Sequence, residues 1–150
     1  SSARYLDQPL EDAAIGPKHT FYNHDALLKN GSQSMRALIV VEGPFDVLKI
    51  DYYGRAFGIR AVGMSTASLS SDQAFLLEEA RPHFRRMIIM GDQTETGTGS
   101  VDAMRLRQQV AFIPGVESMA PPFNLKDAGA MTPRQAINWA RMIASEGVTA

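Results

Sequence analysis

The stretch ALIVVEGPFDVLKI, residues 37–50, decides the fold that this sequence predicts. Its first five residues, 37–41, are all apolar, and the acidic turn Glu42-Gly43 and then Pro44 follow them. An apolar run of this length that ends in a turn is typical of a strand buried in a parallel sheet, and proline suits the first turn of a helix. The stretch therefore predicts a buried strand, a turn and a helix in direct succession.

Short strands and helices alternate from this point to the end of the chain. The predicted strands are 37–41, 59–64, 87–90 and 116–120, and the predicted helices begin at residues 44, 70, 100 and 133. This order predicts an α/β fold with about four parallel strands and helices on both faces of the sheet. Residues 1–35 show no such pattern, and we expect them to form an irregular N-terminal arm.

Spacing and capping signals mark the helices. Phe45, Leu48 and Tyr52 recur at helical spacing in the first of them. The second and last helices open on capping boxes, Ser70 with Gln73 and Thr132 with Gln135, in which each side chain bonds the backbone at the other's position. In the last helix we expect Trp139 to anchor the core.

Acidic residues follow two of the predicted strands. Glu42 comes directly after the first strand, and Asp92 follows the strand 87–90. Ligands of open parallel sheets bind at the carboxyl ends of the strands, so both side chains are predicted to face one crevice, where a divalent cation would offset their repulsion. Oxygen ligands suit Mg²⁺ or Mn²⁺. The alternative is that Glu42 and Asp92 begin turns and cap the following helices.

Composition excludes several classes of protein. The 150 residues are 45% hydrophobic, which is enough for the core of one domain, and they include no cysteine for a disulfide, a thiolate zinc site or a cysteine nucleophile. No apolar run is long enough to span a membrane, and we expect a cytoplasmic protein with no membrane partner. The net charge of −1 argues against a surface that is basic throughout.

The acidic pattern resembles the TOPRIM domain of primases, topoisomerases and related nucleases. The resemblance covers about residues 36–130 and depends on the apolar strand, Glu42-Gly43, Asp46 three residues on, and the second strand that ends at Asp92. In this family a glutamate and a later D-x-D pair surround magnesium in a compact, Rossmann-like parallel sheet. The resemblance implies a TOPRIM domain over residues 36–150, C-terminal helix included.

Two flanking segments are similar to those of bacterial and phage primases. Residues 4–28, with Phe21-Tyr22-Asn23, resemble the segment just before TOPRIM in these enzymes, and Lys126-Asp127 resembles their K-D loop. The resemblance therefore implies the catalytic core of a DNA primase, most similar to the phage primase-helicase type. Residues 1–35 would then be the end of the preceding primase subdomain.

One position departs from the family pattern. Where the second aspartate of D-x-D is expected, this chain has Thr94, followed by Glu95 and, at the position of the family's glycine, Gly97. A hydroxyl can ligate magnesium but brings no charge, so the affinity for a second ion should be lower. Glu95 is an alternative ligand.

The resemblance also implies roles for individual residues. Glu42 and Asp92 would be catalytic and, with Asp127 and with Thr94 or Glu95 as further ligands, would hold Mg²⁺ or Mn²⁺. Asp46 and Gly43 would support these ligands. The residues expected to contact nucleotide or DNA are Arg4, Lys126 and Gly97.

The implied reaction is the synthesis of RNA primers from nucleoside triphosphates on a single-stranded DNA template during replication, alongside a replicative helicase domain or protein. The sequence contains no zinc ribbon, no helicase P-loop and no basic subdomain, so we expect a piece of a larger primase with little activity alone. Two alternatives stay open. Thr94 favours a degenerate, non-catalytic TOPRIM module of a helicase, and the family also includes metal-dependent nucleases and topoisomerases.

Overall fold

The computed structural model describes residues 19–28, 35–91 and 98–146, and for residues 98–103 it describes the backbone alone. Within these ranges strands and helices alternate as predicted. The elements are β1 (Met35–Val41), α1 (Pro44–Gly54), β2 (Ile59–Gly63), α2 (Ser71–Ala80), β3 (Phe84–Met90), α3 (Thr98–Gln109), β4 (Val116–Met119) and α4 (Pro133–Ser145). Short 3-10 helices include η3 (His24–Leu27) and η7 (Ala128–Ala130). The predicted α/β fold is confirmed.

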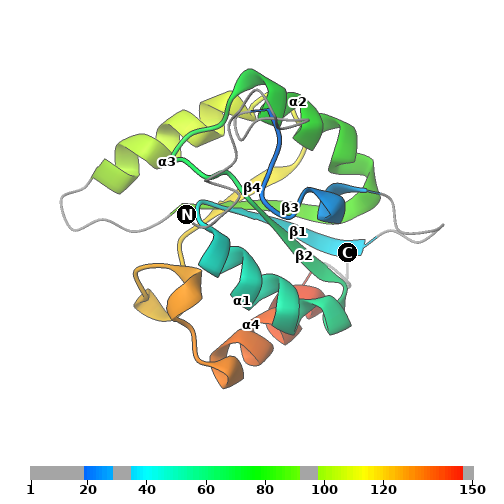
Figure 1. Cartoon of the computed structure of the whole chain (residues 1–150), viewed down its shortest axis with the longest axis vertical. Helices are drawn as coiled ribbons and strands as arrows, with labels where there is room; N and C mark the ends of the chain where they lie inside the picture. Colours follow the sequence, from blue (N-terminus) through cyan, green and yellow to red (C-terminus); the bar gives the residue numbers. More distant parts are fainter. Residues whose placement is uncertain (1–18, 29–34, 92–97, 147–150) are drawn as a thin grey trace, which may run out of the picture.

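The four strands form one parallel sheet in the order β2-β1-β3-β4 (Figure 1). From β1 the chain passes to β2 on one side, and from β2 it returns to β3 on the other side of β1. The strand order therefore reverses between β1 and β3, and ligands of open α/β sheets bind outside the carboxyl ends of such a strand pair. Val40 pairs with Ile89, so the first residue after β1, Glu42, lies at this reversal point.

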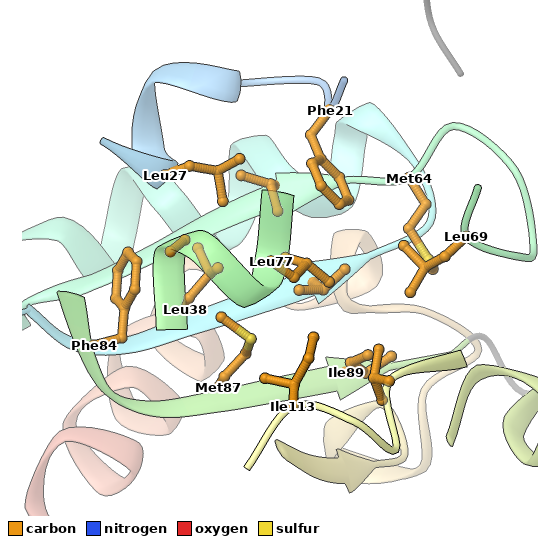
Figure 2. Packing of buried hydrophobic residues seen from close by; sticks show 14 of the residues in the cluster. Phe21, Leu27, Leu38, Met64, Leu69, Leu77, Phe84, Met87, Ile89 and Ile113 are labelled. Carbon is orange, nitrogen blue, oxygen red and sulfur yellow. The ribbon is translucent and has the colours of Figure 1, made fainter. Parts of the chain in front are cut away.

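Helices cover both faces of the sheet, with α2 and α3 on one side and α1 and α4 on the other (Figure 1). Successive side chains of β1 enter opposite layers, as the pleat of a strand requires. Leu38 packs with Met87 of β3 and Leu77 of α2 in the first layer (Figure 2). In the second layer, Ile39 packs among the buried residues of α1 and α4. Both faces of the strand are buried, which is why its sequence is continuously apolar.

The apolar spacing that predicts α1 does not mark its buried face. Phe45, Leu48 and Tyr52 are exposed, at 78%, 53% and 76% of their surface. The buried side instead carries Asp46, Val47, Ile50, Asp51 and Gly54. Gly54 lets α1 lie close to β2, since a side chain built at this position would meet Ile59 at 3.0 Å. Trp139 of α4 is buried among the same side chains, as predicted.

Both predicted capping boxes are present. The hydroxyl of Ser70 accepts from the amide of Gln73, and Thr132 does the same for Gln135. These bonds join residues three apart and need no tertiary contact, which is why a sequence pattern can predict them. None of the helices in the described part has the length and apolarity that a membrane span requires.

The described part of the N-terminal arm packs onto the domain. Tyr22 pairs with Gly63 through two backbone hydrogen bonds of 2.9 and 3.0 Å, so it covers the end of the edge strand β2. Phe21 and Leu27 are buried against the layer that contains Leu77 (Figure 2). Residues 19–28 are therefore a packed part of the fold, although their sequence lacks regular periodicity.

Candidate functional site

Glu42 lies at the carboxyl end of β1 in a turn held by backbone bonds. Its carbonyl accepts from the amide of Ser65, and the carbonyl of Val41 accepts from the amide of Met64, both at 2.8 Å. The side chain is half-buried, and its carboxylate forms no hydrogen bond or ion pair with any other described residue. Glu42 therefore has a fixed backbone, and no described residue binds its carboxylate.

The structure bears on the capping alternative for Glu42. The N-cap of α1 is Gly43, and the carboxylate that reaches back to it belongs to Asp46, whose Oδ2 accepts from the Gly43 amide at 3.4 Å. Glu42 contributes no side-chain hydrogen bond to this helix start. Asp46, which follows the acidic turn by one helical turn, takes the capping role instead.

Asp46 also joins α1 to a distant segment. Its Oδ1 accepts from the amide of Gly129 in η7 at 2.8 Å, across 83 positions of sequence. Gly43 is the neighbour of Glu42, and Gly129 follows Asp127 by two residues. One buried carboxylate, 5% exposed, therefore bonds to the backbone of both segments that carry the predicted ligands.

Asp127 is the N-cap of η7, and its Oδ1 accepts from the amide of Ala130 at 3.0 Å. A methyl group built at Gly129 would lie 3.1 Å from Oδ1 of Asp46 and 3.5 Å from Oδ1 of Asp127. The two carboxylates thus approach the same point beside the Cα of Gly129. Glycine at this position allows the close approach, because any larger side chain would push against Asp46.

The pKa of Asp46 is raised above its ordinary value of 3.8. Burial is the largest cause, and the negative charge of Asp127 adds to it, while the amides of Gly129 and Gly43 act in the opposite direction. Within the described residues no cation is paired with Asp46. A positive ion bound between these carboxylates would offset both the cost of burying the charge of Asp46 and its repulsion by Asp127.

Several predicted site residues are not brought together by the described structure. Lys126 is exposed and, within the described residues, forms no hydrogen bond or ion pair. The positions Arg4, Asp92, Thr94, Glu95 and Gly97 lie outside the described residues. In the part of the chain that the structure describes, no three His, Asp or Glu side chains are grouped closely enough to hold a metal ion. Asp46 and Asp127 alone are therefore an incomplete ligand set.

Two residues of this site were not predicted from the sequence. Gly129 is bonded to Asp46, and Lys49, one turn after Asp46, donates from Nζ to the carbonyl of Met131 at 2.6 Å. A glycine two residues after an expected ligand is a weak signal for close backbone approach. For Lys49 the sequence offers none, because a lysine on a helix is ordinarily a solvated surface residue.

A separate hollow of about 330 Å³ lies between α3 and the edge strand β4. Its lining is mostly apolar and includes Leu106, Val110, Ile113 and Val116. These side chains belong to the α2/α3 layer or pack against it, on the face of the sheet opposite Asp46 and Asp127. The hollow is therefore a feature of that layer and contributes nothing to the acidic site.

Comparison with known proteins gives a match by structure. No protein-family model matches the sequence, and no curated protein does. The fold is similar to the crystal structure of the primase fragment of the bacteriophage T7 primase-helicase protein, with a TM-score of 0.54 and 18% identity. The match covers 87% of this chain and 50% of that one, so this chain spans half the length of the T7 fragment.

A second solved structure is that of bacteriophage T7 lagging-strand DNA polymerase interacting with primase domains of two gp4 subunits bound to an RNA/DNA hybrid and dTTP. It matches with a TM-score of 0.49 and 19% identity, over 73% of this chain and 55% of the other. At 18% identity the first match establishes the fold alone: this chain is similar in fold to about half of the T7 primase fragment.

Proposed function

We propose that this chain is the TOPRIM part of a DNA primase, which synthesises RNA primers on single-stranded DNA with the help of Mg²⁺ or Mn²⁺. The observation that carries the proposal is the meeting of two acidic turns at the strand reversal. Glu42 follows β1, Asp127 begins η7, and Asp46 bonds to the backbone beside each of them. The similarity of the fold to the T7 primase fragment supports the same proposal.

The described residues fit a divalent metal ion in type, although they do not complete its coordination. All the side chains involved offer carboxylate oxygens, which suit Mg²⁺ and Mn²⁺. Burial, and to a lesser extent repulsion by Asp127, raise the pKa of Asp46, and a nearby cation would act against both effects. We assign Glu42, Asp92 and Asp127 as ligands, with Thr94 or Glu95 as further ones. Such an ion would neutralise charge that develops on the transferred phosphoryl group.

The chain's own residues would position the reactants around this ion. Asp46, whose oxygens both accept backbone amides, would keep the two acidic turns at a constant separation. Lys126, exposed beside Asp127, would contact the phosphates of a nucleoside triphosphate or of the template, and Arg4 and Gly97 are assigned to the same task. A replicative helicase, as a domain or a separate protein, is the partner expected to supply the template.

A second candidate function is a non-catalytic TOPRIM module that binds template within a helicase. One observation favours it: Thr94 stands where a second aspartate is expected. This candidate predicts DNA binding without any metal binding that depends on Glu42.

Metal binding and primer synthesis, measured on the same variants, test the proposal. Calorimetric titration with Mn²⁺ should show binding that Glu42→Gln and Asp127→Asn each weaken by about tenfold or more, because each removes one charged ligand. Glu78→Gln, the same substitution at an exposed residue of α2, is the matched control and should bind as the unchanged chain does.

Primer synthesis is measured with single-stranded template, labelled ribonucleoside triphosphates and Mn²⁺. We expect weak synthesis by the chain alone and none by Glu42→Gln. Binding of Mn²⁺ that neither Glu42→Gln nor Asp127→Asn alters, together with no synthesis, would overturn the proposal in favour of the non-catalytic module.

A further inference from the structure

The contact between Lys49 and Met131 joins α1 to the segment that carries Asp127. Lys49 is half-buried on α1, and its Nζ donates to the carbonyl of Met131 at 2.6 Å across 82 positions of sequence. Met131 is the C-cap of η7 and precedes Thr132, the N-cap of α4. The bond therefore holds the junction between η7 and α4 against α1.

Lys49 and Asp46 hold the same segment at two points. They lie three residues apart, on one side of α1, and their partners Gly129 and Met131 lie two residues apart in and after η7. A short 3-10 helix held at one point is free to turn about that bond, whereas two bonds define its direction. Asp127, at the first position of this segment, is thereby oriented by α1.

Charged side chains contact both ends of η7. The ammonium group of Lys49 donates to the carbonyl of Met131, the C-cap, and the carboxylate of Asp127, the N-cap, accepts from the amide of Ala130. Hydrogen bonds with a charged donor are shorter than neutral ones, in agreement with the 2.6 Å separation. Both ends of η7 are therefore held by charged side chains.

We propose that Lys49 is a positioning residue of the acidic site: with Asp46 it clamps η7 to α1 and so holds the carboxylate of Asp127 where a metal ion needs it. This inference rests on the proposed function, since it concerns the same metal site. It adds to that site a residue whose own side chain touches neither metal nor nucleotide.

The test separates positioning from ordinary stabilisation with a matched pair of variants. Lys49→Met keeps the length of the side chain and removes its donor. Arg36→Met removes a similar bond, from Arg36 to the carbonyl of Ala144 at 3.1 Å, at the opposite end of β1. Thermal unfolding, Mn²⁺ titration and amide hydrogen exchange are measured on both variants and on Lys49→Arg.

We expect the two methionine variants to lose similar thermal stability and to differ in metal binding. Lys49→Met should weaken Mn²⁺ binding about tenfold, as the loss of a group that orients a ligand does, and should speed exchange of the Gly129 amide. Arg36→Met should change neither. Lys49→Arg, which still offers a charged donor, should recover most of the affinity. Equal Mn²⁺ affinity and equal Gly129 exchange in both methionine variants would overturn the inference.

Failure of the proposed function would have a different signature. If the unchanged chain bound no Mn²⁺, or bound it independently of Glu42, the metal site itself would be refuted. Exchange at Gly129 would then still decide whether Lys49 holds η7, because that measurement requires no metal. Faster exchange in Lys49→Met alone would support the clamp, and unchanged exchange would refute it.

Discussion

The two carboxylates buried on α1 have the same exposure but different partners. Asp46 and Asp51 are each 5% exposed. Asp51 is bonded to Arg60 at 2.8 Å, to Arg55 at 2.7 Å and to the amide of Ala61 at 3.0 Å. Asp46 has backbone amides as partners, and a second carboxylate, Asp127, lies nearby. Burial alone thus says little about the role of a carboxylate.

The two pKa values differ in direction for this reason. Burial would raise the pKa of Asp51, but the hydrogen bonds from Arg60, Arg55 and Ala61 outweigh it and hold the pKa below 3.8. For Asp46 burial is again the largest cause, and there the amides do not outweigh it. Asp51 is a neutralised structural link between α1 and β2, whereas Asp46 keeps an uncompensated charge at the strand reversal, where a cation would be useful.

The largest expected effect comes from removing the charge of Asp51. Asp51→Asn should lower the free energy of unfolding by about 3 kcal/mol, because it leaves the partly buried guanidinium of Arg60 without its partner. Urea unfolding measures this, with Asp25→Asn at an exposed position of η3 as control, expected within about 0.5 kcal/mol of the unchanged chain. A loss as small as that of the control would contradict the structural role of Asp51.

A methyl group at Gly129 should act on the other carboxylate. In Gly129→Ala it would lie 3.1 Å from Asp46 and 3.4 Å from the backbone of Phe45, so η7 must move away from α1. We expect a loss of about 1–2 kcal/mol and weaker Mn²⁺ binding. Gly91→Ala is the control for stability, since no atom of the described residues lies within 4 Å of its added carbon. Unchanged stability and binding in Gly129→Ala would contradict the close approach of Asp46 to η7.

The pH dependence of stability should have opposite signs at the two sites. Because the folded pKa of Asp51 is lowered, its stabilisation is complete above 3.8 and is lost as the pH falls through the folded pKa. Because the folded pKa of Asp46 is raised, the folded chain binds more protons between 3.8 and that pKa, so stability falls as the pH rises through this window.

Unfolding free energies of the unchanged chain, Asp46→Asn and Asp51→Asn, measured in EDTA from about pH 3 to pH 7, check this. The free energy of unfolding of the unchanged chain, relative to that of Asp51→Asn, should increase with pH up to 3.8. The difference in unfolding free energy between the unchanged chain and Asp46→Asn should shrink as the pH rises above 3.8. Parallel curves for the two variants would show that the environments of the carboxylates are alike.

The smallest effect is expected on the outward side of the same helix. Leu48→Gln should change stability by no more than about 0.5 kcal/mol, because Leu48 is 53% exposed. Ile50→Val, a smaller chemical change at a residue 2% exposed, should cost about 1 kcal/mol. The denaturant midpoints of the two variants are compared, with equal m-values as a check on two-state unfolding. A larger loss in Leu48→Gln than in Ile50→Val would show that the side of α1 with Leu48 is the buried one.

Local features were predictable from the sequence. The capping boxes at Ser70 and Thr132 and the strand run of residues 37–41 involve neighbours a few positions apart, so short-range sterics and hydrogen bonds decide them. The buried face of α1 was not predictable in this way. Its apolar spacing points outward, because two ion-paired or amide-bonded aspartates and a glycine take the inward positions.

In the candidate site, too, local features were predictable from the sequence and long-range contacts were not. The sequence predicted that Glu42 follows a buried strand and assigned Asp46 a supporting role. It could not predict that Asp46 bonds to Gly129, or that Lys49 bonds to Met131, because each contact joins residues more than 80 positions apart. Such contacts depend on how α1 and η7 pack onto one face of the sheet.

By itself, then, the sequence determined the order of strands and helices, their caps and the acidic residue at the end of β1. Only the tertiary structure decided that β3 lies beside β1, that Asp127 approaches Asp46, and that Asp51 is neutralised while Asp46 is not. The physical reason is range: hydrogen bonds within one turn are encoded in neighbouring residues. The pKa of a buried carboxylate, in contrast, depends on every charge and amide that folding brings to it.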